Sequence, residues 1–144
     1  MNAPVIWIGL PGVAAISLWV IRKNERLTLF TALIASFLFM VSSWVLQVGK
    51  PLMKLGSFTI QISPSITILG RSFILNNGDL IFISLLFLIL FLFLSMSFVI
   101  DVPPIFVPLS FILICLFISA LSVQPFLYAA LILEICVIIS TILL

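Results

Sequence analysis

The sequence predicts an all-α integral membrane protein of about five transmembrane helices, with a small extramembrane β-hairpin between the second and third. Of its 144 residues, 65% are hydrophobic and 7% are charged, whereas about a quarter of an ordinary soluble domain is charged. So few charged side chains cannot cover the surface of a water-soluble chain of this size. The apolar residues also gather in runs of about 20, the length at which a helix crosses the hydrocarbon core.

Five apolar runs divide the chain, and we expect them to form a single transmembrane domain. Charged or turn-forming residues separate the runs, and only Gln124-Pro125 stands between the last two. A break this short predicts a tight hairpin of two helices. The expected helices cover residues 3–21, 27–48, 80–100, 105–123 and 126–144.

The segment 56–75 has a period of two instead of a helical period. Apolar and polar residues alternate between positions 58 and 63, which is a strand pattern. Two apolar stretches, 66–69 and 72–75, flank Gly70-Arg71, and a glycine at the first of two central residues favours a type II′ turn with positive φ. The pattern predicts a β-hairpin on the membrane face, because open strand edges are excluded from hydrocarbon. An irregular loop is the alternative.

The basic residues predict the orientation of the chain. Arg22, Lys23 and Arg26 lie within five positions, while the other three basic residues are spread over the long segment between the second and third runs. A dense basic cluster is the better cytoplasmic marker. We therefore expect the N-terminus and the hairpin outside and Asp101 on the cytoplasmic side.

Aromatic and polar residues within the runs suggest how the helices are anchored and joined. Three tryptophans fall toward the ends of the first two runs and are typical of interfacial anchors: Trp7, Trp19 and Trp44. Polar side chains inside helices are expected to form hydrogen bonds between helices, among them Ser42, Ser43, Gln47 and Ser97.

Three of the four acidic residues have structural explanations. Glu25 lies among basic residues, so we expect an ion pair in water. Asp79 precedes the third run, where a carboxylate caps free N–H groups and complements the helix dipole. Asp101 follows that run in a proline-containing turn, which is typical of a solvated residue. Asp79 and Asp101 are kept as secondary polar candidates.

Glu134 differs from these three because it lies inside an apolar run. It is the ninth residue of the run 126–144, close to the expected bilayer midplane. A lone carboxylate there is costly unless it is protonated, paired or hydrated, so its charge can change with its surroundings, as a proton-relay residue requires. Ala130 and Thr141 share its helical face, as a packed or hydrated face favours. The alternative is a permanently protonated glutamic acid that makes one interhelical hydrogen bond.

The residue inventory supports no catalytic site, cofactor or metal of the chain's own. There is no histidine, and Cys115 and Cys136 lie inside apolar runs, where a thiol behaves as a small hydrophobe. Paired carboxylates, a Cys-x-x-Cys motif, a nucleophile elbow and a glycine-rich phosphate loop are all missing from the sequence. A net charge of +2 is too small for a nucleic-acid surface.

Three stretches resemble the N-terminal part of the antiporter-like, proton-conducting subunits of respiratory complex I (NADH:quinone oxidoreductase). They are residues 73–80 (FILNNGDL), 106–109 (FVPL) and 122–134 (SVQPFLYAALILE). The first is similar to the segment that enters the third helix in that family, and the last to the loop and fifth helix that carry the family's membrane glutamate. The family also includes subunits of multisubunit sodium/proton antiporters and membrane-bound hydrogenases.

The resemblance implies a proton-translocating subunit that binds no redox cofactor and that is driven by a partner complex or an ion gradient. Family subunits have about fourteen helices with two inverted repeats, and their fifth-helix glutamate pairs with a lysine on the seventh helix. Glu134 is the matching position, and no lysine lies in any expected helix of this chain. We therefore expect a fragment or one piece of a split subunit.

The expected surroundings follow from the same resemblance. The partners are the remaining C-terminal helices of the same subunit, other membrane subunits and lipid. The expected location is the bacterial cytoplasmic membrane, with the N-terminus outside. A different class of function stays open, namely a small multi-helix scaffold or assembly protein without transport activity. The sequence contains no nucleophile or metal-binding constellation that would support a membrane enzyme.

Overall fold

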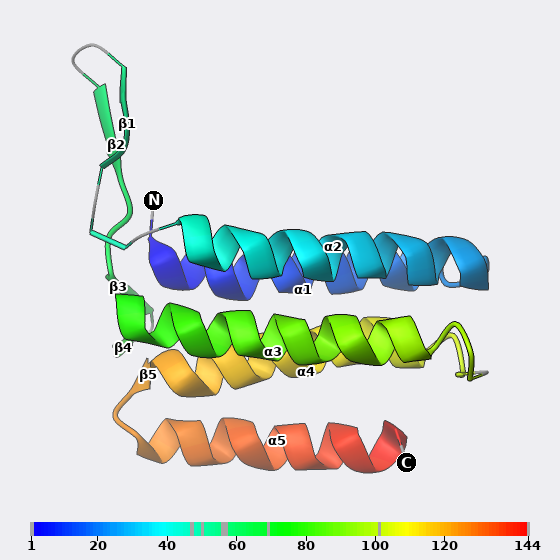
Figure 1. Cartoon of the computed structure of the whole chain (residues 1–144). Coiled ribbons are helices and arrows are strands. Elements are labelled where there is room, and N and C mark those ends of the chain that lie inside the picture. Colours follow the sequence, from blue (N-terminus) through cyan, green and yellow to red (C-terminus); the bar gives the residue numbers. More distant parts are fainter. Residues whose placement is uncertain are drawn as a thin grey trace.

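The computed structural model describes residues 2–46, 48–49, 51–55, 58–68, 70–100 and 102–143, with 51–55, 58–61 and 142–143 described by backbone alone. Helices dominate these residues: α1 (Ala3–Ile21), α2 (Glu25–Val45), α3 (Asn77–Met96), α4 (Phe106–Ser122) and α5 (Leu127–Leu143). The helices lie side by side and alternate in direction along the chain (Figure 1).

Three of the described helices, α1, α2 and α3, are long and apolar enough to cross a membrane, and α4 and α5 are shorter apolar helices. The bounds of α1 are those predicted, but α2 and α3 each begin and end two to four residues earlier than the apolar runs. An apolar run marks the part of a helix that suits hydrocarbon, whereas the helix itself continues wherever backbone hydrogen bonds form.

The early end of α2 has a visible cause in the amide of Asn77. Its Oδ1 accepts a hydrogen bond from the Val48 N–H at 2.7 Å, and its Nδ2 donates to the Val48 carbonyl at 3.1 Å. Both backbone groups of Val48 are thereby satisfied outside the helix. The first residue of α3 thus holds the chain that leaves α2.

Strands gather at the end of the molecule where α1 begins (Figure 1). β1 (Pro51–Leu55) and β2 (Phe58–Gln61) form an antiparallel pair, and β3 (Ser65–Ile68), β4 (Arg71–Ile74) and β5 (Val123–Gln124) form a three-stranded antiparallel sheet. The predicted hairpin is confirmed and the irregular loop is wrong. β1 and β5 were not predicted, because apolar and polar residues do not alternate in β1 and because β5 has only two residues.

The turn of the hairpin is shifted by one residue from the prediction. Gly70 has the expected positive φ, at 73°. However, Ile68 pairs with Arg71, so Arg71 belongs to β4 and not to the turn. This register places Thr67 opposite Ser72 and Ile66 opposite Phe73. Cross-strand neighbours of like polarity stabilise a sheet, and the predicted register would have separated them.

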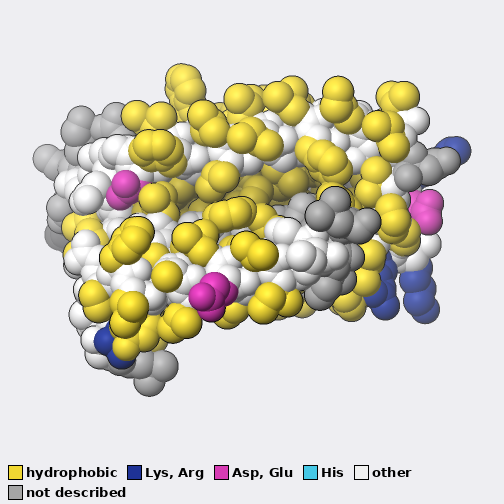
Figure 2. Space-filling view, turned by 90° about the horizontal axis from the view of Figure 1, so that it is seen from below, with side chains coloured by type: hydrophobic (Ala, Val, Ile, Leu, Met, Phe, Trp, Pro, Cys, Tyr) yellow, Lys and Arg dark blue, Asp and Glu magenta, His cyan; other side chains and the backbone are white. Residues whose placement is uncertain are grey.

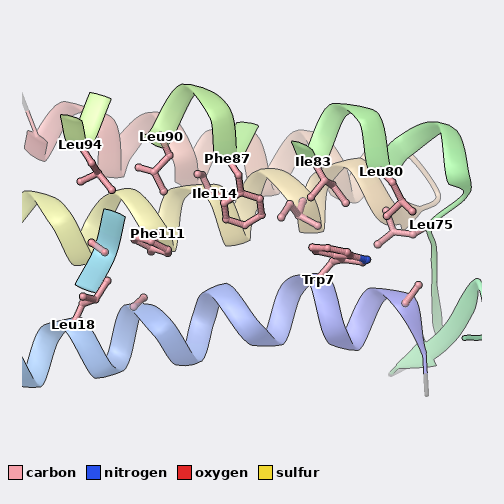
Figure 3. Packing of buried hydrophobic residues seen from close by; sticks show 14 of the residues in the cluster. Trp7, Leu18, Leu75, Leu80, Ile83, Phe87, Leu90, Leu94, Phe111 and Ile114 are labelled. Atoms are coloured by element: carbon pink, nitrogen blue, oxygen red, sulfur yellow. The ribbon is translucent and has the colours of Figure 1, made fainter. Parts of the chain in front are cut away.

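The core lies between α1, α3 and α4 (Figure 3). Trp7 of α1 points toward side chains of α3 and α4, and it is 1% exposed. Phe87 and Phe111 are fully buried in the same cluster. Trp7 is therefore a core residue, and the prediction that it anchors the chain at an interface is wrong. Trp19 and Trp44 are exposed, as anchors would be.

The main helix pairs are α1 with α4, α2 with α3, and α4 with α5. A Cβ on Gly12 of α1 would lie 3.8 Å from the Cys115 sulfur of α4, and this thiol donates to the Ile8 carbonyl at 3.2 Å. Between α2 and α3, the Trp44 indole N–H donates to the Ser84 hydroxyl. Small or polar residues at these crossings are typical of helices that pack in membranes.

The serines predicted to join helices bond within their own helix instead. Their hydroxyls donate to carbonyls three or four residues earlier in the chain: Ser42 to Phe39, Ser43 to Met40 and Ser97 to Phe93. A short hydroxyl side chain reaches this acceptor without help from a neighbour. The prediction is wrong for these three serines, and Gln47 lies outside the described residues.

The alternating helices place the turn of residues 22–24 and the β-strands at opposite ends of the molecule (Figure 1). We predict that Thr67→Cys is labelled by a membrane-impermeant maleimide in intact cells, whereas Asn24→Cys is labelled only after the membrane is opened. The reason is the basic cluster at the turn, which favours the cytoplasmic side. Efficient labelling at position 24 from outside would reverse the orientation.

Candidate functional site

α5 is the outermost helix of the molecule and packs on α4 (Figure 1). Its inner face carries Ala129 and Cys136, each 2% exposed, with Ile132 partly buried beside them. Small side chains at 129 and 136 let the helix approach α4 closely. Because these two buried positions lie on one side of α5, the residues on the opposite side of the helix face outward.

Glu134 lies on the exposed side of α5, seven residues after the first residue of a 17-residue helix. This separation is about 10 Å along the axis, so the carboxylate lies near mid-length. Its exposed neighbours are apolar, including Leu131 and Ile138 at 52% and 60% exposure. Figure 2 views the molecule from the α5 side and shows hydrophobic side chains over most of this face, with a carboxylate among them.

Glu134 has no hydrogen-bond or ion-pair partner among the residues that the structure describes. The two hydroxyls that follow Glu134 along α5 are bound to the backbone of the helix: Ser140 donates to the Cys136 carbonyl and Thr141 to the Ile138 carbonyl, both at 2.7 Å. Ala130 and Thr141 are exposed with Glu134. The predicted grouping on one face is therefore present, and no described helix of the chain covers that face.

Asp79, on α3, and Glu25, on α2, are not brought to Glu134. Asp79 lies in the first turn of α3, where its Oδ2 accepts a hydrogen bond from the Asn76 N–H at 2.8 Å, so its predicted role as a helix cap is confirmed. Asp101 lies outside the described residues. Glu25 forms no ion pair with Arg22, Lys23 or Arg26, so that prediction is wrong. Within the described part of the chain, no cluster of acidic, cysteine or histidine side chains could hold a metal ion.

A clamp formed by the β-strands and Arg71 holds the start of α5. β5 pairs with β4 through Phe73↔Val123, and Phe73 packs on a small cluster that includes Ala129. The Arg71 guanidinium lies over the Tyr128 ring, 3.7 Å from its centroid. In the sequence, Arg71 is one of three basic residues spread over the long segment between the second and third apolar runs. No sequence pattern could have found this contact, because it depends on the pairing of strands 50 residues apart.

A groove of about 630 Å³ runs between α2 and α3, at the end of these helices that lies next to the β-strands. Apolar side chains dominate its lining, and its polar members are uncharged: Ser43, Trp44, Asn77 and Ser84. None of the described residues that line it carries a titratable carboxylate, amine or thiol. These residues can accept an apolar group but offer no acid–base or nucleophilic chemistry, which leaves Glu134 as the stronger candidate.

Comparison of the chain with protein-family models, with curated proteins and with solved structures finds no match.

The contact between Arg71 and Tyr128 should contribute measurably to stability. A partly exposed cation–π pair is worth about 1 kcal/mol, so we predict a coupling of that size between Arg71→Leu and Tyr128→Leu in a double-mutant cycle. Thermal unfolding in detergent, followed by tryptophan fluorescence, provides the measurement. Arg26→Leu combined with Tyr128→Leu is the control and should be additive. If the changes in unfolding free energy caused by the Arg71 and Tyr128 substitutions were additive, the cation–π contact would contribute nothing to stability.

Proposed function

We propose that the chain is the N-terminal part of a proton-translocating membrane subunit, of the kind found in complex I-like or cation/proton antiporter complexes. In this proposal Glu134 is one station of the proton path. The observation that carries it is the position of Glu134: mid-length on an apolar helix, on a face that no described helix of the same chain covers.

The cost of a carboxylate in hydrocarbon supports a partner on this face. A charged side chain near the bilayer centre is costly, and such residues face other helices or a water-filled path instead of lipid. Since α1–α4 lie on the other side of α5 (Figure 1), the covering helices come from elsewhere in the assembly. A subunit with a longer chain or with separate partner subunits meets this requirement.

A relay role requires a carboxyl group that can take up and release a proton. Surrounding hydrocarbon favours the neutral carboxylic acid, and a cation brought close favours the carboxylate. A lysine on a later helix, as the resemblance implies, would provide this cation, because no lysine lies within the bounds of α1–α5. Movement of that lysine toward or away from Glu134 would then drive a proton off or on.

The second candidate is a membrane scaffold or assembly protein that docks through the same face. The exposed apolar side chains around Glu134 favour it, because they can pack on a partner helix without any proton transfer. In that case Glu134 stays protonated and makes one hydrogen bond. Glutamine, which has similar size and hydrogen-bonding groups, would replace it.

We predict that Glu134→Gln in the assembled membrane complex lowers proton translocation by tenfold or more while the complex still assembles. Glutamine keeps the hydrogen bond but cannot exchange a proton. Acidification of inside-out vesicles, driven by the complex's own donor or gradient, measures translocation, and native gel electrophoresis measures assembly.

Two control variants separate the candidates. Glu134→Asp keeps an ionisable group and should retain part of the proton flux. Asp79→Asn removes a charge from the cap of α3, outside the proposed path, and should leave the flux close to normal. Unchanged flux in Glu134→Gln would leave the scaffold as the function of this chain.

A further inference from the structure

The turn between α1 and α2 is compact and held by hydrogen bonds. The Asn24 N–H donates to the Ile21 carbonyl at 3.0 Å. The buried Thr28 hydroxyl contacts the carbonyls of Ile21 and Asn24 at 3.0 and 2.9 Å. These contacts satisfy the last carbonyl of α1, that of Ile21, and fix the turn against the first turn of α2. The side chains that project from it therefore start from a defined backbone.

The turn concentrates positive charge that the described part of the chain does not neutralise. Arg22, Lys23 and Arg26 provide three positive charges and Glu25 one negative charge, a net +2 over residues 22–26. Lys23, Glu25 and Arg26 are exposed, and none of the four forms an ion pair with another described residue. An anion from outside the chain can therefore meet three free cationic groups.

A tryptophan sets the position of one of these cations. The Arg22 guanidinium lies over the Trp19 ring, 4.4 Å from its centroid, and the ring is 40% exposed. A tryptophan at the end of an apolar helix belongs at the boundary between hydrocarbon and headgroups. The guanidinium stacked on it is thereby held at the level of the headgroups. Its planar fork matches two oxygens of a phosphate.

The start of α2 adds uncapped backbone donors to the same place. Asn24 is the N-cap residue of α2, but its side chain makes no capping hydrogen bond. The N–H groups of the first helical turn point toward the turn and favour an anion. Cationic side chains and backbone donors thus converge at the end of two long apolar helices.

We propose that this turn binds the phosphate of an anionic phospholipid headgroup. The inference depends on the membrane location that the proposed function requires, but not on proton transfer at Glu134. A lipid fits better than a free anion because Trp19 and Arg22 place the charge where an apolar helix meets the polar turn. The lipid's acyl chains would then lie along the exposed apolar side chains at the end of α1, such as Val20 at 74% exposure.

The test uses the full chain with Trp44→Phe in lipid vesicles, where Trp19 is the exposed tryptophan and Trp7 is buried. Quenching of its fluorescence is compared between brominated phosphatidylglycerol and brominated phosphatidylcholine at equal mole fraction. We expect at least about tenfold enrichment of phosphatidylglycerol at low ionic strength, given a net charge of +2 near the surface. High salt should weaken this preference.

Charge variants identify the residues responsible. Arg22→Gln/Lys23→Gln/Arg26→Gln should abolish the preference, and Lys23→Gln alone, at an exposed position, should lower it about fivefold. Arg71→Gln, at the opposite end of the molecule, should leave it unchanged, and Glu25→Gln should raise it. If the preference for phosphatidylglycerol survives the triple substitution, the basic turn is not the lipid-binding site.

Two further outcomes would overturn the proposal in distinguishable ways. A chain that does not float with the vesicles in a density gradient would remove the membrane location, and with it both this site and the proposed function. A chain that floats but is quenched equally by both lipids would remove the lipid site alone. Displacement of phosphatidylglycerol by millimolar inorganic phosphate would reassign the site to a free anion.

Discussion

The contact between α1 and α4 determines how the other helices are arranged. Gly12 gives α4 room at the crossing, the Cys115 thiol bonds to the Ile8 carbonyl, and Trp7 fills the space toward α3. These groups come from segments about 100 residues apart, so the chain between them must return to the same place. α2 and α3 do this as an antiparallel pair, joined by the Trp44–Ser84 hydrogen bond and by the tilted rings of Phe39 and Phe87, whose centroids lie 5.1 Å apart.

The strands at one end of the molecule transmit this arrangement to α5. β4 lies between β3 and β5, so it connects the hairpin to the link that joins α4 and α5. Phe73 and Arg71, on this one strand, contact the start of α5 through an apolar cluster and a cation–π pair. The sheet thereby contributes to the orientation of α5, and the orientation of α5 decides that Glu134 faces outward.

The two ends and the outer face of the molecule differ in chemistry, as a membrane subunit would require. One end carries the sheet, and the other carries the uncompensated basic turn beside Trp19. Between them, the outer face of α5 combines apolar side chains with a single carboxylate. A lipid headgroup at the basic turn and a partner helix at α5 would be bound by different side chains. The loss of one of these two interactions would therefore leave the other in place.

The sequence by itself determined the helices, because apolar runs of about 20 residues have few alternatives to a helix when the backbone must satisfy its own hydrogen bonds. It also determined the hairpin and the positive φ of Gly70, since a period of two and a glycine at a turn are local signals. The mid-helix position of Glu134 follows directly from counting along an apolar run. The cap formed by Asp79 is local in the same way.

Only the tertiary structure decided how these elements face one another, because that depends on residues far apart in the chain. Trp7, at the end of an apolar run, has the sequence context of an interfacial anchor, yet it fills the core because α3 and α4 close over it. The one-residue shift of the hairpin follows from cross-strand pairing, and the Arg71–Tyr128 contact follows from the position of β5. The outward direction of Glu134 also depends on the tertiary structure, since apolar residues occur on the buried and on the exposed side of α5. Only the contacts of Ala129 and Cys136 with the rest of the chain select its inner face.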